Sequence, residues 1–212
     1  MGGGCRTGSC FGEAGWRGAY HDLLDNDDGF IHGSQIDFFQ IRGRYYGNNI
    51  DEARLESLRL IDIVSLAPWN RFFKPVSWKV ATGVEQRTFT GDRDRLVAFL
   101  NGGAGITGQT GPALFFATFD GELGVGSAYH GGFAASAGGT AGIMTTFAGW
   151  WKFNLSIKDL EPVAGDIYRS RKGEVGQNFT VNRDNSVSLQ VSRERTNWVY
   201  RSEATLLWNC YY

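Results

Sequence analysis

The sequence contains no run of 18 or more apolar residues, so it has no candidate transmembrane helix. This absence does not exclude a membrane protein, because a transmembrane β-strand needs only about 9–11 residues and presents every second one to lipid. Only four prolines interrupt the 212 residues, and charged residues make up 20% of them. The formal net charge of −1 gives no reason to expect a nucleic acid as partner.

Cysteine is also scarce, with Cys5, Cys10 and Cys210 as the three examples. Their spacing matches no zinc or redox motif, and we expect neither a metal nor another cofactor. A Cys5–Cys10 disulfide across a short turn would fit an oxidising compartment, and free thiols are the alternative. Met1 is followed by three glycines, which does not resemble a signal peptide. If the protein belongs in an outer membrane, we therefore expect the chain to be a mature fragment or the tail of a longer precursor.

What the sequence does contain is alternation of apolar and polar residues with a period of two, which is typical of β-strands. In residues 151–158, for example, Trp151, Phe153, Leu155 and Ile157 share one face, and polar residues occupy the other. Turn-forming residues separate such segments. The pattern predicts about eleven strands, at roughly residues 10–24, 33–47, 53–67, 75–89, 95–108, 112–126, 131–146, 149–161, 168–182, 186–196 and 199–212. One irregularity is expected near Phe38–Phe39, where the apolar residues change parity, as they do at a β-bulge.

Eleven strands conflict with the even number that single-chain bacterial barrels have. We therefore interpret residues 1–9 as the stub of a truncated strand or as a tail, and the first interpretation gives twelve strands. The predicted fold is all-β: a single domain over residues 1–212 that forms an antiparallel, up-and-down transmembrane β-barrel of about 12 strands.

The polar faces of the predicted strands carry charged residues. This favours a membrane barrel over a soluble one, because burying unpaired charge in a packed core is costly. The strands are also long for a globular protein. We expect these charged residues to face the lumen: Arg42, Arg44, Lys79, Glu85, Asp120, Glu122, Lys152 and Lys158. Their mixed signs favour internal ion pairs and a plugged or narrow lumen, although the same residues could line a pore. We expect these aromatic residues to lie at the membrane interfaces: Trp16, Tyr20, Tyr45, Trp69, Trp151, Trp198, Trp208 and Tyr212.

Candidate chemistry is sparse. His130 with Ser127 or Ser136 is the combination that a barrel-embedded lipid hydrolase or acyltransferase would need, but no Gly-x-Ser-x-Gly motif accompanies it. Asp25 to Gly29 resembles part of a calcium loop, but Ile36 stands where the bidentate glutamate belongs. We therefore predict no catalytic residues and no metal site.

Three segments resemble one known family: Ala19–Tyr46, Asn70–Arg87 and Glu203–Tyr212. They are similar to the C-terminal barrel of Gram-negative outer-membrane proteins that carry an Lnb-type, papain-like periplasmic domain upstream. The resemblance implies a location in the outer membrane and a barrel fold. The upstream domain is absent from this sequence, so its peptidase-like activity is not carried over.

The expected function is therefore a membrane anchor or scaffold for a periplasmic domain fused upstream. Its expected partners are outer-membrane lipid, that domain, and the barrel-assembly machinery, whose recognition signal the final strand resembles at Trp208, Cys210 and Tyr212. A narrow channel for small solutes is the main alternative. A lipid-modifying enzyme and a soluble ligand-binding barrel, with its apolar face inside, are further alternatives.

Overall fold

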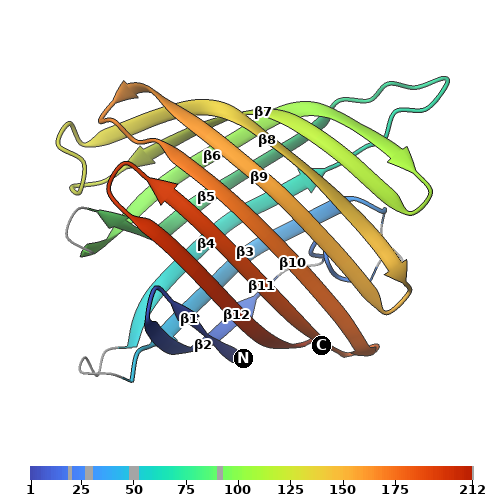
Figure 1. The fold of residues 1–212 in the computed structure, drawn as a ribbon, viewed down its shortest axis with the longest axis horizontal. Helices are drawn as coiled ribbons and strands as arrows, with labels where there is room; N and C mark the ends of the chain where they lie inside the picture. Colours follow the sequence, from blue (N-terminus) through green and yellow to red (C-terminus); the bar gives the residue numbers. More distant parts are fainter. Residues whose placement is uncertain (19–20, 27–30, 48–52, 90–92, 212) are drawn as a thin grey trace.

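The computed structural model describes residues 1–18, 21–26, 31–47, 53–89 and 93–211. Twelve antiparallel strands close into one barrel, in which each strand pairs with its neighbours in sequence and β1 also pairs with β12 (Figure 1). Within the described ranges, no helix is long and apolar enough to cross a membrane. The strands are β1 (Gly2–Arg6), β2 (Ser9–Arg17), β3 (Ser34–Tyr45), β4 (Ala53–Ser65), β5 (Ser77–Phe89), β6 (Arg93–Thr110), β7 (Ala113–Val125), β8 (Phe133–Ala148), β9 (Trp151–Gly165), β10 (Ser170–Asn182), β11 (Asn185–Thr196) and β12 (Tyr200–Cys210).

The predicted fold class and strand number are confirmed. Residues 1–9 contain the short strand β1, which brings the total to twelve and pairs with both β2 and β12. Thr7 and Gly8 connect β1 to β2 with positive φ angles of 39° and 89°. Cys5 and Cys10 face each other across this hairpin and form a disulfide.

An even number of strands places both chain ends at the same end of the barrel. Here the Met1 amino group donates a hydrogen bond to the carbonyl oxygen of Trp208, near the end of β12. We call this the terminal end; it also carries the β2–β3, β4–β5, β6–β7, β8–β9 and β10–β11 connections, and these lie toward the right of Figure 1. The opposite, distal end carries the β1–β2, β3–β4, β5–β6, β7–β8, β9–β10 and β11–β12 connections.

The apolar parity of the strands points away from the barrel interior. Phe119 is 71% exposed, Ile157 63% and Leu206 55%, although all three lie within strands. The predicted change of parity in β3 is confirmed, since Phe39 has a φ of 52° and both it and Phe38 are exposed, but the β3–β4 register shifts at Arg42/Gly43 and not at the expected bulge position. This backbone change lets β3 keep its polar residues inside on either side of the two phenylalanines.

The strand predicted for residues 10–24 is wrong in its second half, because β2 ends at Arg17. His21 still pairs with Ile36 of β3 through an isolated antiparallel bridge, and the residues after it turn into the barrel. Asp22 accepts a hydrogen bond from the backbone N–H of Leu24, and Asp25 accepts one from the backbone N–H of Asp22. Such local bonds from aspartate side chains to the backbone compete with strand pairing.

Candidate functional site: an occluded lumen

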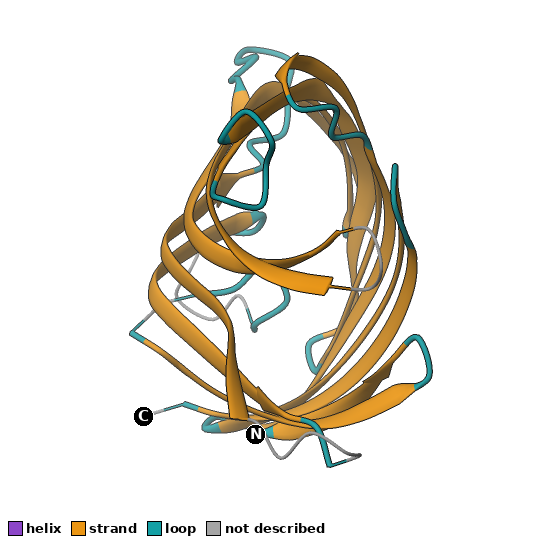
Figure 2. Cartoon of the chain, turned by 90° about the vertical axis from the view of Figure 1, so that its left-hand side faces the viewer, coloured by secondary structure: helices purple, strands orange, loops and turns teal. Residues whose placement is uncertain are grey.

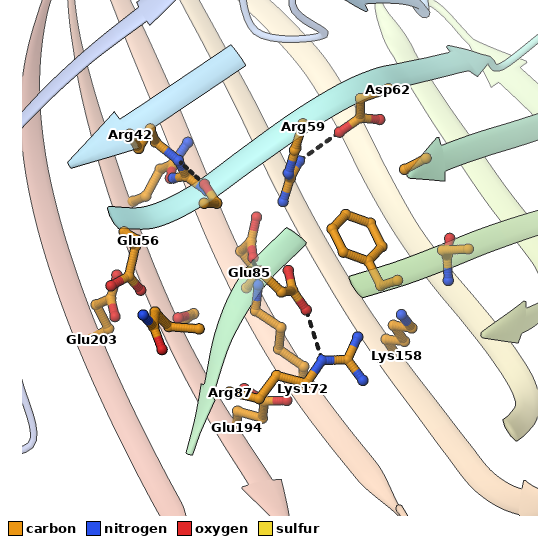
Figure 3. A pocket seen from close by; sticks show the side chains of 18 of the residues that line it. Arg42, Glu56, Arg59, Asp62, Glu85, Arg87, Lys158, Lys172, Glu194 and Glu203 are labelled. Carbon is orange, nitrogen blue, oxygen red and sulfur yellow. Dashed lines mark hydrogen bonds and ion pairs between the residues drawn. The ribbon is translucent and has the colours of Figure 1, made fainter. Parts of the chain in front are cut away.

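The barrel lumen contains a partly open chamber of about 440 Å³ whose wall is strongly charged (Figure 3). Side chains from many strands reach it; Arg42, Glu85 and Lys172, from β3, β5 and β10, surround the same space. Charges of both signs alternate around the wall and nearly balance. The cations are Arg6, Arg42, Arg44, Arg59, Arg87, Lys158, Lys172 and Arg201; the acids are Asp22, Asp37, Glu56, Asp62, Glu85, Glu122, Glu174, Glu194 and Glu203.

All eight residues expected in the lumen lie on the inner face. The chamber is lined by Arg42, Arg44, Glu85, Glu122 and Lys158. The other three make contacts inside the wall: Lys79 Nζ lies 2.8 Å from Asp120 Oδ2, and Lys152 Nζ donates to the carbonyl oxygen of Leu23 at 3.3 Å.

The Lys79–Asp120 pair spans β5 and β7, with β6 between them. Asp120 is fully buried and also accepts hydrogen bonds from the hydroxyl groups of Thr118 and Thr140. On β6, Gly103 makes room for the pair, because a Cβ atom there would lie 2.2 Å from Asp120 Oδ1.

A larger network joins the strands on either side of the short strand β1. Arg44 on β3 contacts three carboxylates: Glu13 at 2.6 Å, Glu203 at 2.7 Å and Glu56 at 3.2 Å. Arg6 on β1 forms ion pairs with Glu56 and Glu203. The network therefore ties β1, β2, β3, β4 and β12 together through side chains. This adds to the backbone pairing of β1, which has only five residues. The sequence analysis placed Arg44 correctly on the inner face but did not single out Arg6 or Glu56, because neither lies in a segment of clear alternation.

A third network lies opposite, on β5, β7 and β9. The carboxylate of Glu122 forms ion pairs with Arg87 at 2.8 Å and with Lys158 at 2.6 Å. Arg87 also donates to the hydroxyl group of Tyr129 at 3.1 Å and stacks over the ring of Tyr168 at 4.9 Å. A buried carboxylate with two cationic partners is well neutralised, which is what burial of charge requires.

Near the distal end, the β5–β6 hairpin reaches across the barrel and narrows the lumen (Figure 2). Asp94 of this hairpin pairs with Arg54 of β4 at 2.6 Å, and its carboxylate lies 3.9 Å from Arg6 of β1. Thr88 accepts a hydrogen bond from Arg201 of β12 at 3.3 Å. Strands β1 and β12 are not neighbours of β5 or β6 in the sheet, so these contacts cross the lumen.

The terminal end is narrowed by residues 22–26. Asn178 of β10 donates to the carbonyl oxygen of Leu24 at 2.8 Å, and Lys152 of β9 binds the preceding carbonyl group. Asp25 accepts from Arg17 at 2.7 Å and from the hydroxyl group of Tyr211 at 2.5 Å. Burial and the nearby Asp25 carboxylate raise the pKa of Tyr211, so its hydroxyl group remains a donor at neutral pH. The segment is thus bound to β2, β9, β10 and the residue that follows β12.

Apolar packing supports both inward-turned segments. At the terminal end, Leu23 packs against a buried cluster of Leu66, Leu114 and Met144. At the distal end, Val97, Tyr129, Ala134 and Tyr168 form a second buried cluster, against which Phe89 of the β5–β6 hairpin packs. The lumen is therefore narrowed near both ends by these segments, which we call the closures, and the partly open charged chamber lies between them.

The expected interfacial aromatics divide into three groups. Tyr20 and Tyr212 lie outside the described residues. Exposed side chains are those of Trp16, Tyr45, Trp69 and Trp208, and Trp151 is partly buried on the outer face against Phe147, Trp150 and Phe179. Trp198 differs from the expectation: its ring lies 5.0 Å from that of Phe89 and 5.9 Å from that of Tyr168. It packs in the distal cluster because the β11–β12 turn bends over the lumen, which alternation within strands does not predict.

Among the described residues, no hydrogen bond joins His130 to Ser127 or Ser136. Ser136 is buried and donates to the backbone carbonyl oxygen of Tyr168 at 2.6 Å, whereas His130 and Ser127 lie exposed in the β7–β8 connection. Over the part of the chain that the structure describes, no group of three or more His, Cys, Asp or Glu side chains is arranged to hold a metal ion.

Replacing Asp120 by Ala should destabilise the barrel by about 3 kcal/mol, because Lys79 would remain as an inward charge without its carboxylate. Asp159 is the matched control, since it is also an aspartate in an ion pair on a strand, with Arg171, but it is 46% exposed on the outside. Asp159→Ala should cost less than about 1 kcal/mol. Denaturant unfolding of the protein in detergent micelles measures both changes. Equal destabilisation by the two substitutions would contradict a structural role for the buried pair.

Comparison with known proteins gives three results. No curated protein matches the sequence. Among solved structures, the chain is similar to the outer membrane channel DcaP of Acinetobacter baumannii, with 10% sequence identity and a TM-score of 0.37; the match covers 93% of this chain and 62% of that one. The chain therefore spans less than two thirds of the length of this structure. The model of the Domain of unknown function DUF7840 matches residues 1–211, and the chain belongs to this family.

Proposed function

We propose that this chain is an outer-membrane barrel that anchors a periplasmic domain fused upstream of it and performs no catalysis of its own. The observation that carries the proposal is the combination of an apolar outer face with a charged interior that inward-turned segments and ion pairs narrow near both ends. An apolar exterior needs lipid, and a narrowed interior suits an anchor better than a pore.

The outer face supports the membrane location because it is apolar along many strands and carries exposed tryptophan near the terminal end. Tryptophan is exposed near the terminal end, where Trp16, Trp150 and Trp208 lie. Exposed tryptophan near one end of a barrel is typical of the aromatic girdle at a membrane interface. On the same outer face of β9, the apolar positions up to Ile157 are followed by Asp159 and Glu161 toward the distal end. Lipid-facing strands change from apolar to charged residues at the membrane surface.

The Cys5–Cys10 disulfide also supports an extracytoplasmic location, because disulfides persist in oxidising compartments. In the proposed orientation, the terminal end faces the periplasm, so that a domain fused before Met1 lies on the side where the expected partner belongs. On the final strand, Leu206 and Trp208 are exposed at alternate positions. They present the apolar face that we propose for recognition by the barrel-assembly machinery.

The proposal is tested by placing a soluble reporter domain directly before Met1 and exporting the fusion to the periplasm. The reporter should sediment with the outer membrane and resist protease added to intact cells. The same reporter without the barrel is the control and should stay in the soluble fraction. A soluble fusion would contradict membrane anchoring, and cleavage of the reporter in intact cells would contradict the proposed orientation.

A channel remains the second candidate, because the two closures leave a polar chamber of about 440 Å³ between them. Side chains do not fill the middle of the lumen, so displacement of both closures would open a continuous polar path. The two candidates differ in whether the closures stay in place at rest.

Conductance in planar bilayers separates them. The native barrel should be silent, and so should the single variants Asp94→Ala and Asp25→Ala, because each leaves one closure intact. The combined variant loses both carboxylates that hold the closures and should show openings. Asp184→Ala, in an exposed turn, is the control and should remain silent. Steady openings of the native barrel would favour the channel; silence of a correctly folded combined variant would contradict the assigned closures.

A further inference from the structure

The outer face of β11 changes character near the distal end. Its outward positions are apolar at Val187, Leu189 and Val191 and then become arginine at Arg193 and Arg195. Both arginines are exposed. Through β10, Arg195 is in register with Asp159 and Arg193 with Ile157 on β9, where the outward residues also change from apolar to charged, and the two arginines thus lie at the edge of the apolar belt.

These two arginines lie among like charges. Arg195 is directly opposite Arg171 on β10, and like charges directly opposite on one face of a sheet are destabilising. Arg171 has an acidic partner, Asp159, at 2.9 Å on β9. Among the described residues, no carboxylate lies within ion-pair distance of Arg193 or Arg195. The acidic residues of this surface, Asp159 and Glu161, therefore pair with Arg169 and Arg171 and leave the β11 arginines without an ion-pair partner.

One aromatic ring orients both side chains. The guanidinium groups of Arg193 and Arg195 lie 5.9 Å and 5.0 Å from the centre of the Tyr200 ring, on the adjacent strand β12. Stacking on an aromatic ring restricts long side chains without using their N–H donors. Two guanidinium groups are thus held close together with their donors available, an arrangement that matches the oxygens of a phosphate group.

We propose that Arg193 and Arg195, with Tyr200, bind the phosphorylated headgroup of a membrane lipid at the distal edge of the apolar belt. A lipid is favoured over a soluble anion because the site continues directly into Val191 and the apolar surface below it, so acyl chains and headgroup are bound by one surface. This inference rests on the proposed membrane location. In the proposed orientation, the lipid belongs to the outer leaflet.

The test compares the native barrel with the Arg193→Gln/Arg195→Gln variant in micelles of a zwitterionic detergent. The probe is lipid A, a diphosphorylated glycolipid, and binding is measured by titration calorimetry. The double variant should bind about tenfold more weakly, as expected for the loss of charge-assisted hydrogen bonds. Arg183→Gln removes an exposed arginine from the β10–β11 turn at the terminal end and should bind like the native barrel.

Each outcome is decisive for this site. Unchanged binding by the double variant would overturn the proposal. Equally tight binding of inorganic phosphate would overturn it too, because the site would then take a free anion. Insertion into bilayers of zwitterionic lipid alone is measured in parallel for both proteins. Failure of both to insert would contradict the membrane location, whereas normal insertion without headgroup preference would contradict only the arginine site.

Discussion

Neutralisation of charge inside a closed wall is the constraint on which the rest of this structure depends. An inner face that carries arginine, lysine and acidic residues on almost every strand is stable only if those charges are paired, because unpaired charge in a confined space is costly. The networks around Arg44, Glu122 and Asp120 meet this requirement, and each spans three or more strands. They therefore tie together strands of the wall that are not direct neighbours in the sheet.

The same constraint explains how the lumen is narrowed. Arg6 and Arg54 attract Asp94 at the tip of the β5–β6 hairpin, so the hairpin bends inward and does not extend the wall. Arg17 attracts Asp22 and Asp25, and residues 22–26 turn in at the other end. Both closures use carboxylates of segments that turn inward, one at the start of β6 and one in the β2–β3 connection, to neutralise cations of the wall.

Alternation predicted the fold class, eleven of the twelve strands and the inward parity of the eight lumen residues, because period two is a property of each strand alone. The twelfth strand was predicted from the even strand number of single-chain bacterial barrels. Alternation also located the backbone change at Phe39. It could not predict that β2 stops at Arg17, since this depends on aspartate side chains that bind the backbone and on partners from distant strands. Trp198 illustrates the same limit, because its position depends on how a turn bends over the lumen. The ion-pair partners Arg6, Glu56 and Asp94 are set by the closed topology, which brings β1, β4 and the β5–β6 hairpin together.

Site-directed spin labelling in lipid bilayers tests most directly whether the apolar face meets lipid while the charged face is enclosed. Leu155 and Asn154 are adjacent on β9; Leu155 is 39% exposed on the outer face, and Asn154 lines the chamber. In a Cys210→Ser background, a label at Leu155→Cys should be accessible to oxygen dissolved in the bilayer. A label at Asn154→Cys should be poorly accessible both to oxygen and to a water-soluble nickel complex. A label at position 155 that meets the nickel complex, or one at position 154 that meets bilayer oxygen, would contradict the account.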